Sequence, residues 1–244
     1  MNYQHKYYKY KQKYIDLQNI LLIKNGGGKK EMKPYITFSD KILQKLDKDI
    51  FVKRILKICA KNKLNPNKLS IMDMGAGHGN TSLGLTYYFK KVIAIEPSVS
   101  MLEQAEIYKN RLKKLQPDEF NENKVTFIQN NFYDALNVKP VNIIILSNSI
   151  HFAEVNTVEN VLDNLLNYLL KGGLVIISEP WTNAIFGSPI LNQDNDFRKN
   201  KLEKIKNIRE EIDTFIEKST KVKLIKSKNY NDDKYYIIII KKII

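Results

Sequence analysis

A glycine-rich stretch at residues 69–80 constrains the fold more than any other part of this sequence. It reads Leu-Ser-Ile-Met-Asp-Met-Gly-Ala-Gly-His-Gly-Asn, and its apolar start is typical of a buried strand. The glycines at 75, 77 and 79 allow positive φ angles and a close approach of the backbone to a ligand. The stretch therefore predicts a strand, a tight turn and the start of a helix, and by itself it fits several kinds of nucleotide site or a tightly packed turn.

Apolar runs and amphipathic segments alternate through the rest of the chain. Strands are expected at about 69–72, 92–95, 125–128, 143–146 and 174–177, with strand-like runs at 221–226 and 235–240. Helices are expected at about 39–65, 81–89, 98–115, 158–170 and 198–218, the fourth closed by a glycine cap at 171–173. This order predicts an α/β fold, with a doubly wound, mostly parallel seven-stranded sheet, helices on both faces and an antiparallel C-terminal hairpin.

Polar groups follow each of the five predicted parallel strands. In chain order these groups are 73–79, Glu96, 130–131, 147–151 and 178–181. The carboxyl ends of parallel strands meet at one edge of a sheet, and ligands bind outside that edge. We therefore expect the five groups to line one cleft.

These residues together resemble the class I S-adenosylmethionine-dependent methyltransferase family, over about residues 35–240. Residues 73–79, Asp-Met-Gly-Ala-Gly-His-Gly, match the family's first motif, Asp-x-Gly-x-Gly-x-Gly. Glu96 lies 17 residues past the last of these glycines, as the family's ribose-binding acid does. Residues 170–174 match the motif before the fifth strand. The resemblance implies a Rossmann-like fold of the small-molecule-type branch and S-adenosylmethionine as cofactor.

The resemblance also implies roles for individual residues. The glycine turn would contact the methionine part of the cofactor, and Asp73 would fix the turn and face the ammonium group. Glu96 would accept hydrogen bonds from both ribose hydroxyls, and Pro97 and Met101 would cover one face of the adenine. The full set of expected cofactor residues is Asp73, Gly75, Ala76, Gly77, Gly79, Glu96, Pro97, Met101, Asn131, Phe132 and Ser147.

Two positions depart from the family's pattern, and one residue separates this family from another. Asn131 stands where an aspartate usually accepts the adenine amine, and Asn142 replaces the commoner aspartate at the start of the fourth strand. Both departures predict weaker cofactor binding. The main alternative is a nicotinamide or flavin dinucleotide site, whose Gly-x-Gly-x-x-Gly fingerprint needs a glycine where Asn80 stands.

Methyl transfer from a sulfonium is an in-line displacement, so the enzyme mainly aligns the reactants and excludes water. A base is needed only for a nucleophile that starts protonated. His151 is the candidate base, and its alternative role is a packing or cofactor-shell histidine. Glu179 and Trp181 are candidates for holding a substrate cation or ring, and Tyr35 and Phe38 for a lid. With three histidines and no clear carboxylate cluster, no metal site is expected.

Missing motifs narrow the acceptor. The Asn-Pro-Pro-Tyr or Asp-Pro-Pro-Tyr tetrapeptide of DNA amino-methyltransferases is not found after the fourth strand, and Cys59 is in the wrong place for a cytosine-C5 nucleophile. Glu179 follows the fifth strand, whereas the paired glutamates of protein arginine methyltransferases follow the fourth. We expect an O, N or C nucleophile of a small molecule. RNA (cap or other), a protein lysine, and a degenerate cofactor-binding regulatory subunit stay as alternatives.

The first 30 residues are basic and rich in tyrosine and lysine, and they end in Gly-Gly-Gly-Lys-Lys. We expect a flexible or helical leader at 1–30 and a methyltransferase domain at 31–244. Leaders of this type are similar to those of some giant-virus proteins, which points to a viral source as one possibility. The net charge of +14 comes from 40 basic residues, of which four are arginine. A solvated lysine surface explains this charge, with RNA contact through the surface and leader as the alternative, because arginine is the preferred residue for recognising phosphate and guanine.

No apolar run approaches the roughly 20 residues that span a bilayer, and the leader is not a secretory signal. The single cysteine fits a reducing compartment, so a cytoplasmic location is expected.

Overall fold

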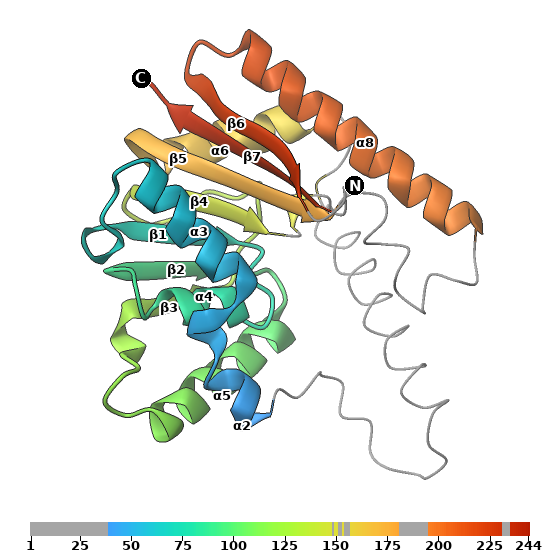
Figure 1. Cartoon of the computed structure of the whole chain (residues 1–244). Helices are drawn as coiled ribbons and strands as arrows, with labels where there is room; N and C mark the ends of the chain where they lie inside the picture. The colour runs from blue at the N-terminus through green and yellow to red at the C-terminus, as the bar shows by residue number, and fades with distance from the viewer. Residues whose placement is uncertain (1–38, 148, 151–152, 154–156, 181–194, 231–234) are drawn as a thin grey trace.

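The computed structural model describes residues 39–147, 149–150, 153, 157–180, 195–230 and 235–244. They form a seven-stranded sheet of order β3-β2-β1-β4-β5-β7-β6 between two layers of helices (Figure 1). In that order the strands are β3 (Val125–Ile128), β2 (Lys91–Ile95), β1 (Ser70–Met74), β4 (Val141–Ser147), β5 (Leu169–Pro180), β7 (Tyr235–Lys242) and β6 (Val222–Tyr230). Neighbouring strands from β1 to β5 are parallel, and β7 is antiparallel to β5 and β6. The predicted fold class is confirmed.

Two helical layers cover the two faces of the sheet. One face carries α2 (Asp40–Leu43), the short turn η1 (Leu46–Lys48), α3 (Ile50–Lys61), α4 (Asn80–Leu85) and α5 (Val99–Leu115). The other carries α6 (Val158–Asn167) and α8 (Asn195–Lys218). Short 3-10 turns precede two of the strands, η2 (Pro66–Lys68) before β1 and η3 (Glu122–Lys124) before β3.

In the interior strands, successive apolar residues belong to different cores. In β7, Ile237 and Ile239 pack in the core under α3 and α5, and Ile238 and Ile240 pack in the core under α6 and α8. All four are buried. A strand covered on both faces needs apolar residues at nearly every position, which is why these strands appear in the sequence as apolar runs, whereas the edge strand β6 does not.

The first predicted helix is interrupted, so the expectation of one helix to residue 65 is wrong. α2 ends at Leu43, and α3 begins only at Ile50. The Asp49 side chain accepts hydrogen bonds from the N–H groups of Phe51 and Val52, at 2.7 and 3.2 Å. An aspartate in this capping position starts a new helix within a continuous apolar pattern.

Helix α6 ends at Asn167 rather than near residue 170. Lys242 of β7 donates from Nζ to the carbonyl oxygens of Leu166 and Leu169, at 2.8 and 2.9 Å. A lysine amine therefore satisfies carbonyl groups at the end of this helix. The glycine cap predicted at 171–173 is wrong.

The glycine pair lies instead within β5, where the pairing with β4 is irregular. Gly172 has a φ of +79°, and the register shifts between Val141 and Ile143 of β4. A Cβ on Gly173 would lie 2.7 Å from the carbonyl oxygen of Asn142. The glycines thus allow a bulge and a close approach of two strands.

The other predicted elements agree with the structure to within a few residues, and β3 begins and ends as predicted. α8 begins at Asn195, three residues before its predicted start. The leader at 1–30, and with it the predicted domain boundary, lies outside the described residues. None of the described helices has both the length and the apolar character needed to cross a membrane.

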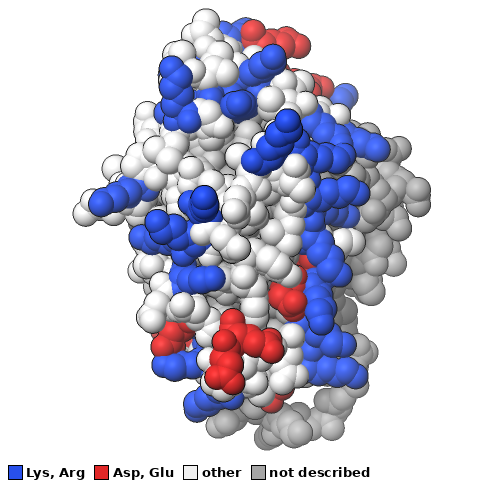
Figure 2. All heavy atoms as spheres, turned by 60° about the vertical axis from the view of Figure 1, so that its left-hand side comes forward, with Lys and Arg blue, Asp and Glu red and all other residues white. Residues whose placement is uncertain are grey.

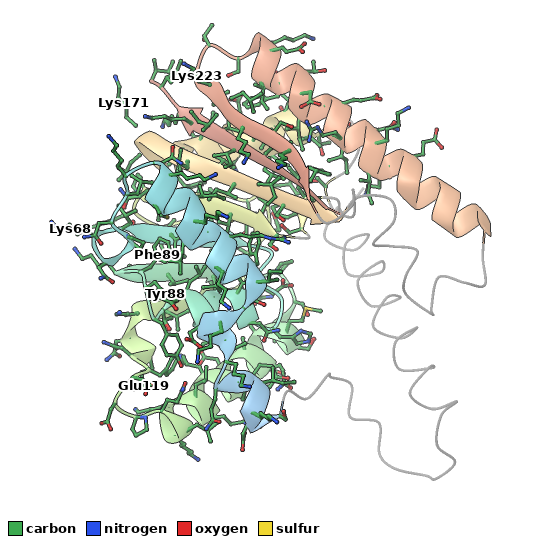
Figure 3. All side chains as sticks on the ribbon, viewed as in Figure 1. Lys68, Tyr88, Phe89, Glu119, Lys171 and Lys223 are labelled. Atoms are coloured by element: carbon green, nitrogen blue, oxygen red, sulfur yellow. The ribbon has the colours of Figure 1, made fainter. Side chains whose placement is uncertain are left out.

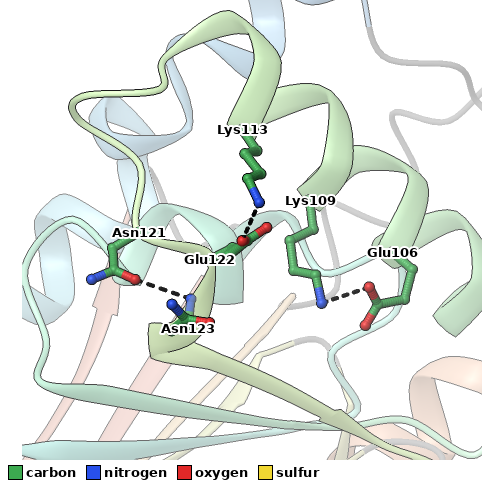
Figure 4. Close-up of polar contacts among 6 residues, drawn as sticks. All are labelled: Glu106, Lys109, Lys113, Asn121, Glu122 and Asn123. Atoms are coloured by element: carbon green, nitrogen blue, oxygen red, sulfur yellow. Dashed lines mark hydrogen bonds and ion pairs between the residues drawn. The ribbon is translucent and has the colours of Figure 1, made fainter.

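Two lysines of α5 have acidic partners (Figure 4). Lys109 Nζ lies 2.6 Å from Glu106 Oε2, and Lys113 pairs with Glu122 of η3. Next to this pair, the Asn121 side chain accepts a hydrogen bond from the N–H of Asn123 at 3.0 Å. Exposed pairs of this kind contribute about 1 kcal/mol at most.

Candidate active site

The glycine turn after β1 is fixed to the end of β2. Gly75, Gly77 and Gly79 have φ angles of +79°, +58° and +77°, which glycine adopts without the steric cost of a side chain. The N–H groups of Gly75 and Ala76 both donate to the Ile95 carbonyl oxygen, at 2.8 and 2.9 Å. The turn therefore has a defined position at the carboxyl edge of the sheet.

Glu96, directly after β2, is fully buried and holds two backbone segments. Its Oε2 accepts a hydrogen bond from the N–H of Gly77 and its Oε1 from the N–H of Ser98, both at 2.9 Å. Glu96 therefore fixes the glycine turn relative to the segment after β2.

Asp73 lies in β1 and is 2% exposed. Its Oδ2 accepts a 2.6 Å hydrogen bond from the hydroxyl of Ser82 in α4. Burial raises the pKa of Asp73 to about 6, while the hydrogen bond from Ser82 opposes the rise and the charge of Glu96 adds to it. Two buried carboxyl groups below the turn favour a cation in this region.

Open space lies beside the middle glycine of the turn. A Cβ on Gly77 would meet, among the described residues, only the Met101 sulfur at 4.0 Å. A Cβ on Gly75 would instead lie 2.5 Å from Ser149 Cβ. A ligand can therefore approach the backbone at Gly77, whereas Gly75 is packed against the segment after β4.

Ser149 adds a buried hydroxyl beside the turn. The residue is 2% exposed, and its Oγ has no hydrogen-bond partner among the described residues. An unpaired buried hydroxyl costs free energy that a bound polar group can recover. With the space beside Gly77, this hydroxyl fits a small ligand with a polar end. Sequence reasoning placed Ser149 in a polar cluster but did not single it out, and it missed Ser82 altogether.

Glu179, near the end of β5, braces the segment after β4. It is 1% exposed, and its Oε1 accepts hydrogen bonds from the N–H groups of Ser149 and Ile150, at 2.7 and 2.9 Å. Its register partner in β7 is Tyr236, whose pKa is raised by burial and further by the charge of Glu179. The structure thus places this substrate candidate among backbone groups of the chain itself.

Asn131, after β3, is engaged in its own loop. Its Oδ1 accepts hydrogen bonds from the N–H groups of Tyr133 and Asp134, at 2.7 and 3.0 Å, and its Nδ2 donates to Asp134 Oδ2 at 2.6 Å. This is the local hydrogen bonding typical of asparagine in turns. An adenine amine would have to compete with these contacts for the amide oxygen.

Asn142 lies at the opposite edge of the sheet. Its Oδ1 accepts hydrogen bonds from the N–H and the hydroxyl of Ser70, at 2.9 and 3.2 Å. The contact joins the starts of β1 and β4, and the glycine turn follows the other end of β1. The asparagine therefore stabilises the pairing of β1 and β4, at the edge of the sheet opposite the glycine turn. We call the edge with the glycine turn the cofactor edge.

The remaining candidates divide into two groups. Pro97, Met101 and Phe132 are buried, and Ser147, half-buried, ends β4. Four others lie outside the described residues: Tyr35, Phe38, His151 and Trp181. No group of three or more potential metal-binding side chains occurs in the part of the chain that the structure describes. Burial raises the pKa of Cys59, in α3, to about 11.

A family profile described as a methyltransferase domain matches residues 43–221. The chain belongs to this family. Together with the sheet order, the match makes the protein a class I methyltransferase that uses S-adenosylmethionine. The open space beside Gly77 and the buried groups around it fit this cofactor. Among curated proteins, no sequence matches the methyltransferase significantly.

Solved structures show the same fold at low sequence identity. Magnesium protoporphyrin IX methyltransferase (ChlM) from Synechocystis PCC 6803, with bound SAH, gives a TM-score of 0.61 at 12% identity, covering 99% of this methyltransferase and 100% of that chain. The plantazolicin methyltransferase BpumL, in complex with a triazolic desmethylPZN analog and SAH, gives a TM-score of 0.55 at 14% identity. The match covers 84% of this chain and 90% of that chain. A SAM dependent methyltransferase from Aquifex aeolicus gives a TM-score of 0.56 at 14% identity. The match covers 85% of this chain and 100% of that chain.

Proposed function

We propose that this methyltransferase transfers a methyl group to an O, N or C nucleophile of a small-molecule acceptor. When bound, S-adenosylmethionine supplies an electrophilic methyl group on a sulfonium. The chain's own residues must bind and orient the cofactor, align the acceptor and exclude water.

The proposed cofactor site follows from the contacts around the turn. Glu96 would accept hydrogen bonds from the ribose hydroxyls, because its carboxylate lies buried beside the turn. The ammonium group would lie near Asp73 and Glu96, whose charge favours a cation. Pro97, Met101 and Phe132 would contact the adenine. The rest of the proposed set is Gly75, Ala76, Gly77, Gly79, Asn131 and Ser147.

The charge of the cofactor edge carries the proposal of a small-molecule acceptor. Among the described residues of the segments that follow β1 to β4 there (75–79, 96–98, 129–137 and 147–153), no lysine or arginine occurs, and the acids are Glu96 and Asp134. Glu179 lies near the end of β5. A polyphosphate acceptor would be repelled by such an edge, and a neutral or cationic small molecule would not. RNA is therefore the less favoured acceptor.

The names of the solved structures include two different acceptors, magnesium protoporphyrin IX and plantazolicin. Enzymes of this fold thus methylate acceptors of different kinds, so we base the proposed acceptor class on the charge of this chain's own cofactor edge.

His151 is our candidate base. It would take the proton of a nucleophile that starts protonated.

Methyl transfer from labelled S-adenosylmethionine into fractionated lysate tests this function. The metabolite, RNA and protein pools are counted separately, with the Glu96→Ala variant as the control for cofactor-dependent label. We expect label in the metabolite pool, and label confined to RNA or protein would overturn the proposed acceptor class. Calorimetric titration with S-adenosylmethionine is run beside the transfer assay, because cofactor binding without transfer to any pool would indicate a degenerate subunit.

A further inference from the structure

Each of the seven strands carries lysine at the edge of the sheet opposite the glycine turn. β1 to β6 begin at this edge, and β7 ends there. The lysines at these strand ends are Lys68, Lys90, Lys91, Lys124, Lys139, Lys171, Lys221, Lys223, Lys241 and Lys242. Figure 3 shows three of them, Lys68, Lys171 and Lys223, along the left-hand side of the molecule.

Most of these lysines are exposed, and their side-chain amines have no hydrogen-bond or ion-pair partner among the described residues. We call this subset the basic edge: Lys68, Lys90, Lys91, Lys139, Lys171, Lys223 and Lys241. The other three have partners, as Lys109 and Lys113 of α5 do (Figure 4). Lys221 pairs with Asp163 at 2.9 Å, and Lys124 and Lys242 donate to backbone carbonyl groups.

The basic edge extends over six of the seven strands, from β2 to β6. Neighbouring strands lie about 4.8 Å apart, so six strands span on the order of 24 Å. Figure 2 turns this side of the molecule forward and shows Lys and Arg side chains scattered over the face among uncharged residues, with Asp and Glu at its top and in its lower part. Lys223 lies on the edge strand β6, where lysine also prevents unwanted strand pairing. Lys68, Lys91 and Lys139 lie at the ends of interior strands, where that explanation does not apply.

We propose that the basic edge binds the phosphodiester backbone of nucleic acid, independently of the acceptor site. Lysine amines contact phosphates as point charges, whereas base recognition favours the planar fork of arginine. Binding at this edge would therefore be independent of base sequence and sensitive to salt. Because the cofactor turn lies at the other edge, the bound nucleic acid would tether the enzyme and would not serve as its methyl acceptor.

Salt-dependent binding of the full chain to labelled single-stranded RNA tests this proposal, with single-stranded and duplex DNA as parallel arms. The test variant is Lys68→Gln/Lys171→Gln/Lys223→Gln. The matched control is Lys41→Gln/Lys45→Gln/Lys48→Gln, which removes the same charge from exposed lysines of α2, η1 and the turn between them. Three lost phosphate contacts should reduce the slope of log affinity against log salt by about 2, because each contact on a single strand contributes about 0.7. The control should keep the wild-type slope.

Several outcomes would overturn the proposal. They are no binding to RNA or DNA by the wild type, equal slopes in wild type and test variant, and an equal loss in the control variant. Binding to phosphatidylserine vesicles with none to nucleic acid would assign the edge to a membrane surface instead. The ratio between the RNA and DNA arms identifies the preferred nucleic acid. An unchanged affinity for S-adenosylmethionine in the test variant shows that its fold is intact and keeps this result separate from the proposed methyl transfer.

Discussion

The Glu96 carboxylate accepts a 2.9 Å hydrogen bond from the backbone N–H of Gly77, which joins the segment after β2 to the turn after β1. The acid expected to bind the ribose therefore also positions the glycine that lies beside the open space. Cofactor binding and the shape of the turn depend on the same side chain.

Replacement of Glu96 should therefore weaken cofactor binding. Glu96→Ala leaves the N–H groups of Gly77 and Ser98 without their acceptor and removes the proposed ribose contacts. Hydrogen bonds to charged groups contribute about 1.5–3 kcal/mol, so we expect a loss of about 10- to 100-fold in affinity for S-adenosylmethionine. Glu96→Gln retains one acceptor oxygen, so its affinity for S-adenosylmethionine in calorimetric titration should lie between those of wild type and Glu96→Ala. Wild-type affinity in the alanine variant would exclude the proposed role.

Asp73 should give the protein a measurable pH dependence of stability. Its pKa in the folded protein is about 6, above the ordinary value of 3.8, because burial penalises the carboxylate. The folded state therefore binds this proton more tightly than the unfolded chain, so the stabilisation is complete below about pH 4 and lost as pH rises through about 6. Relative to Asp73→Asn, wild type should lose on the order of 3 kcal/mol of unfolding free energy as pH rises through this range.

Urea unfolding at a series of pH values measures this difference. Asp118→Asn, which removes an exposed carboxylate, is the matched control and should leave the pH profile close to that of wild type. Ser82→Ala removes the hydrogen bond that opposes the rise in the pKa of Asp73. In this variant the stabilisation should therefore be lost at a higher pH than in wild type. Parallel stability curves for wild type and Asp73→Asn would contradict the raised pKa.

Alanine at two glycines of the turn should have different effects. Gly77 and Gly79 both have positive φ, so both variants carry backbone strain. A Cβ on Gly79 would lie 2.8 Å from a ring atom of Phe127, and overpacking of this kind typically costs about 1–3 kcal/mol. Gly79→Ala should therefore lower the urea midpoint more. Gly77→Ala should mainly weaken S-adenosylmethionine binding, and normal binding by this variant would show that no ligand approaches there.

We expect Glu179 to stabilise the segment after β4 and not to bind substrate. Glu179→Ala leaves two buried N–H groups, those of Ser149 and Ile150, without an acceptor, which predicts a loss of about 2–5 kcal/mol in the free energy of unfolding. Glu179→Gln keeps an acceptor oxygen and should lose less. Hydrogen exchange of the two amides should accelerate in the alanine variant. If stability and exchange stay unchanged while only acceptor affinity falls, the side chain holds substrate instead.

The order of elements could be predicted because each kind of element leaves a local pattern. Buried strands such as β3 appear as short apolar runs, and the predicted limits 125–128 are those observed. The spacing of Asp73, Gly77 and Glu96 was also informative, because the turn after β1 and the end of β2 are neighbours in any parallel sheet of this order. These residues do lie together at one edge.

Other features could not be predicted because they depend on partners far along the chain. Glu179 and Ser149 are 30 residues apart, and Ser70 and Asn142 are 72 apart, and no local pattern identifies such pairs. Two local signals were available but were outweighed by their surroundings. Asp49 lies within an apolar periodicity that favoured one long helix, and Gly172 follows a helix closely enough to resemble its cap.

The position of β7 has a consequence for synthesis on the ribosome. β7 comes last among the described strands, yet it lies between β5 and β6. While residues 169–230 emerge, β5 therefore exposes an apolar edge and β6 has no neighbour to pair with. At about 5–20 residues per second, this half of the sheet stays open for seconds until residues 235–242 arrive. A nascent chain stalled before that point would be a natural substrate for chaperones or proteases.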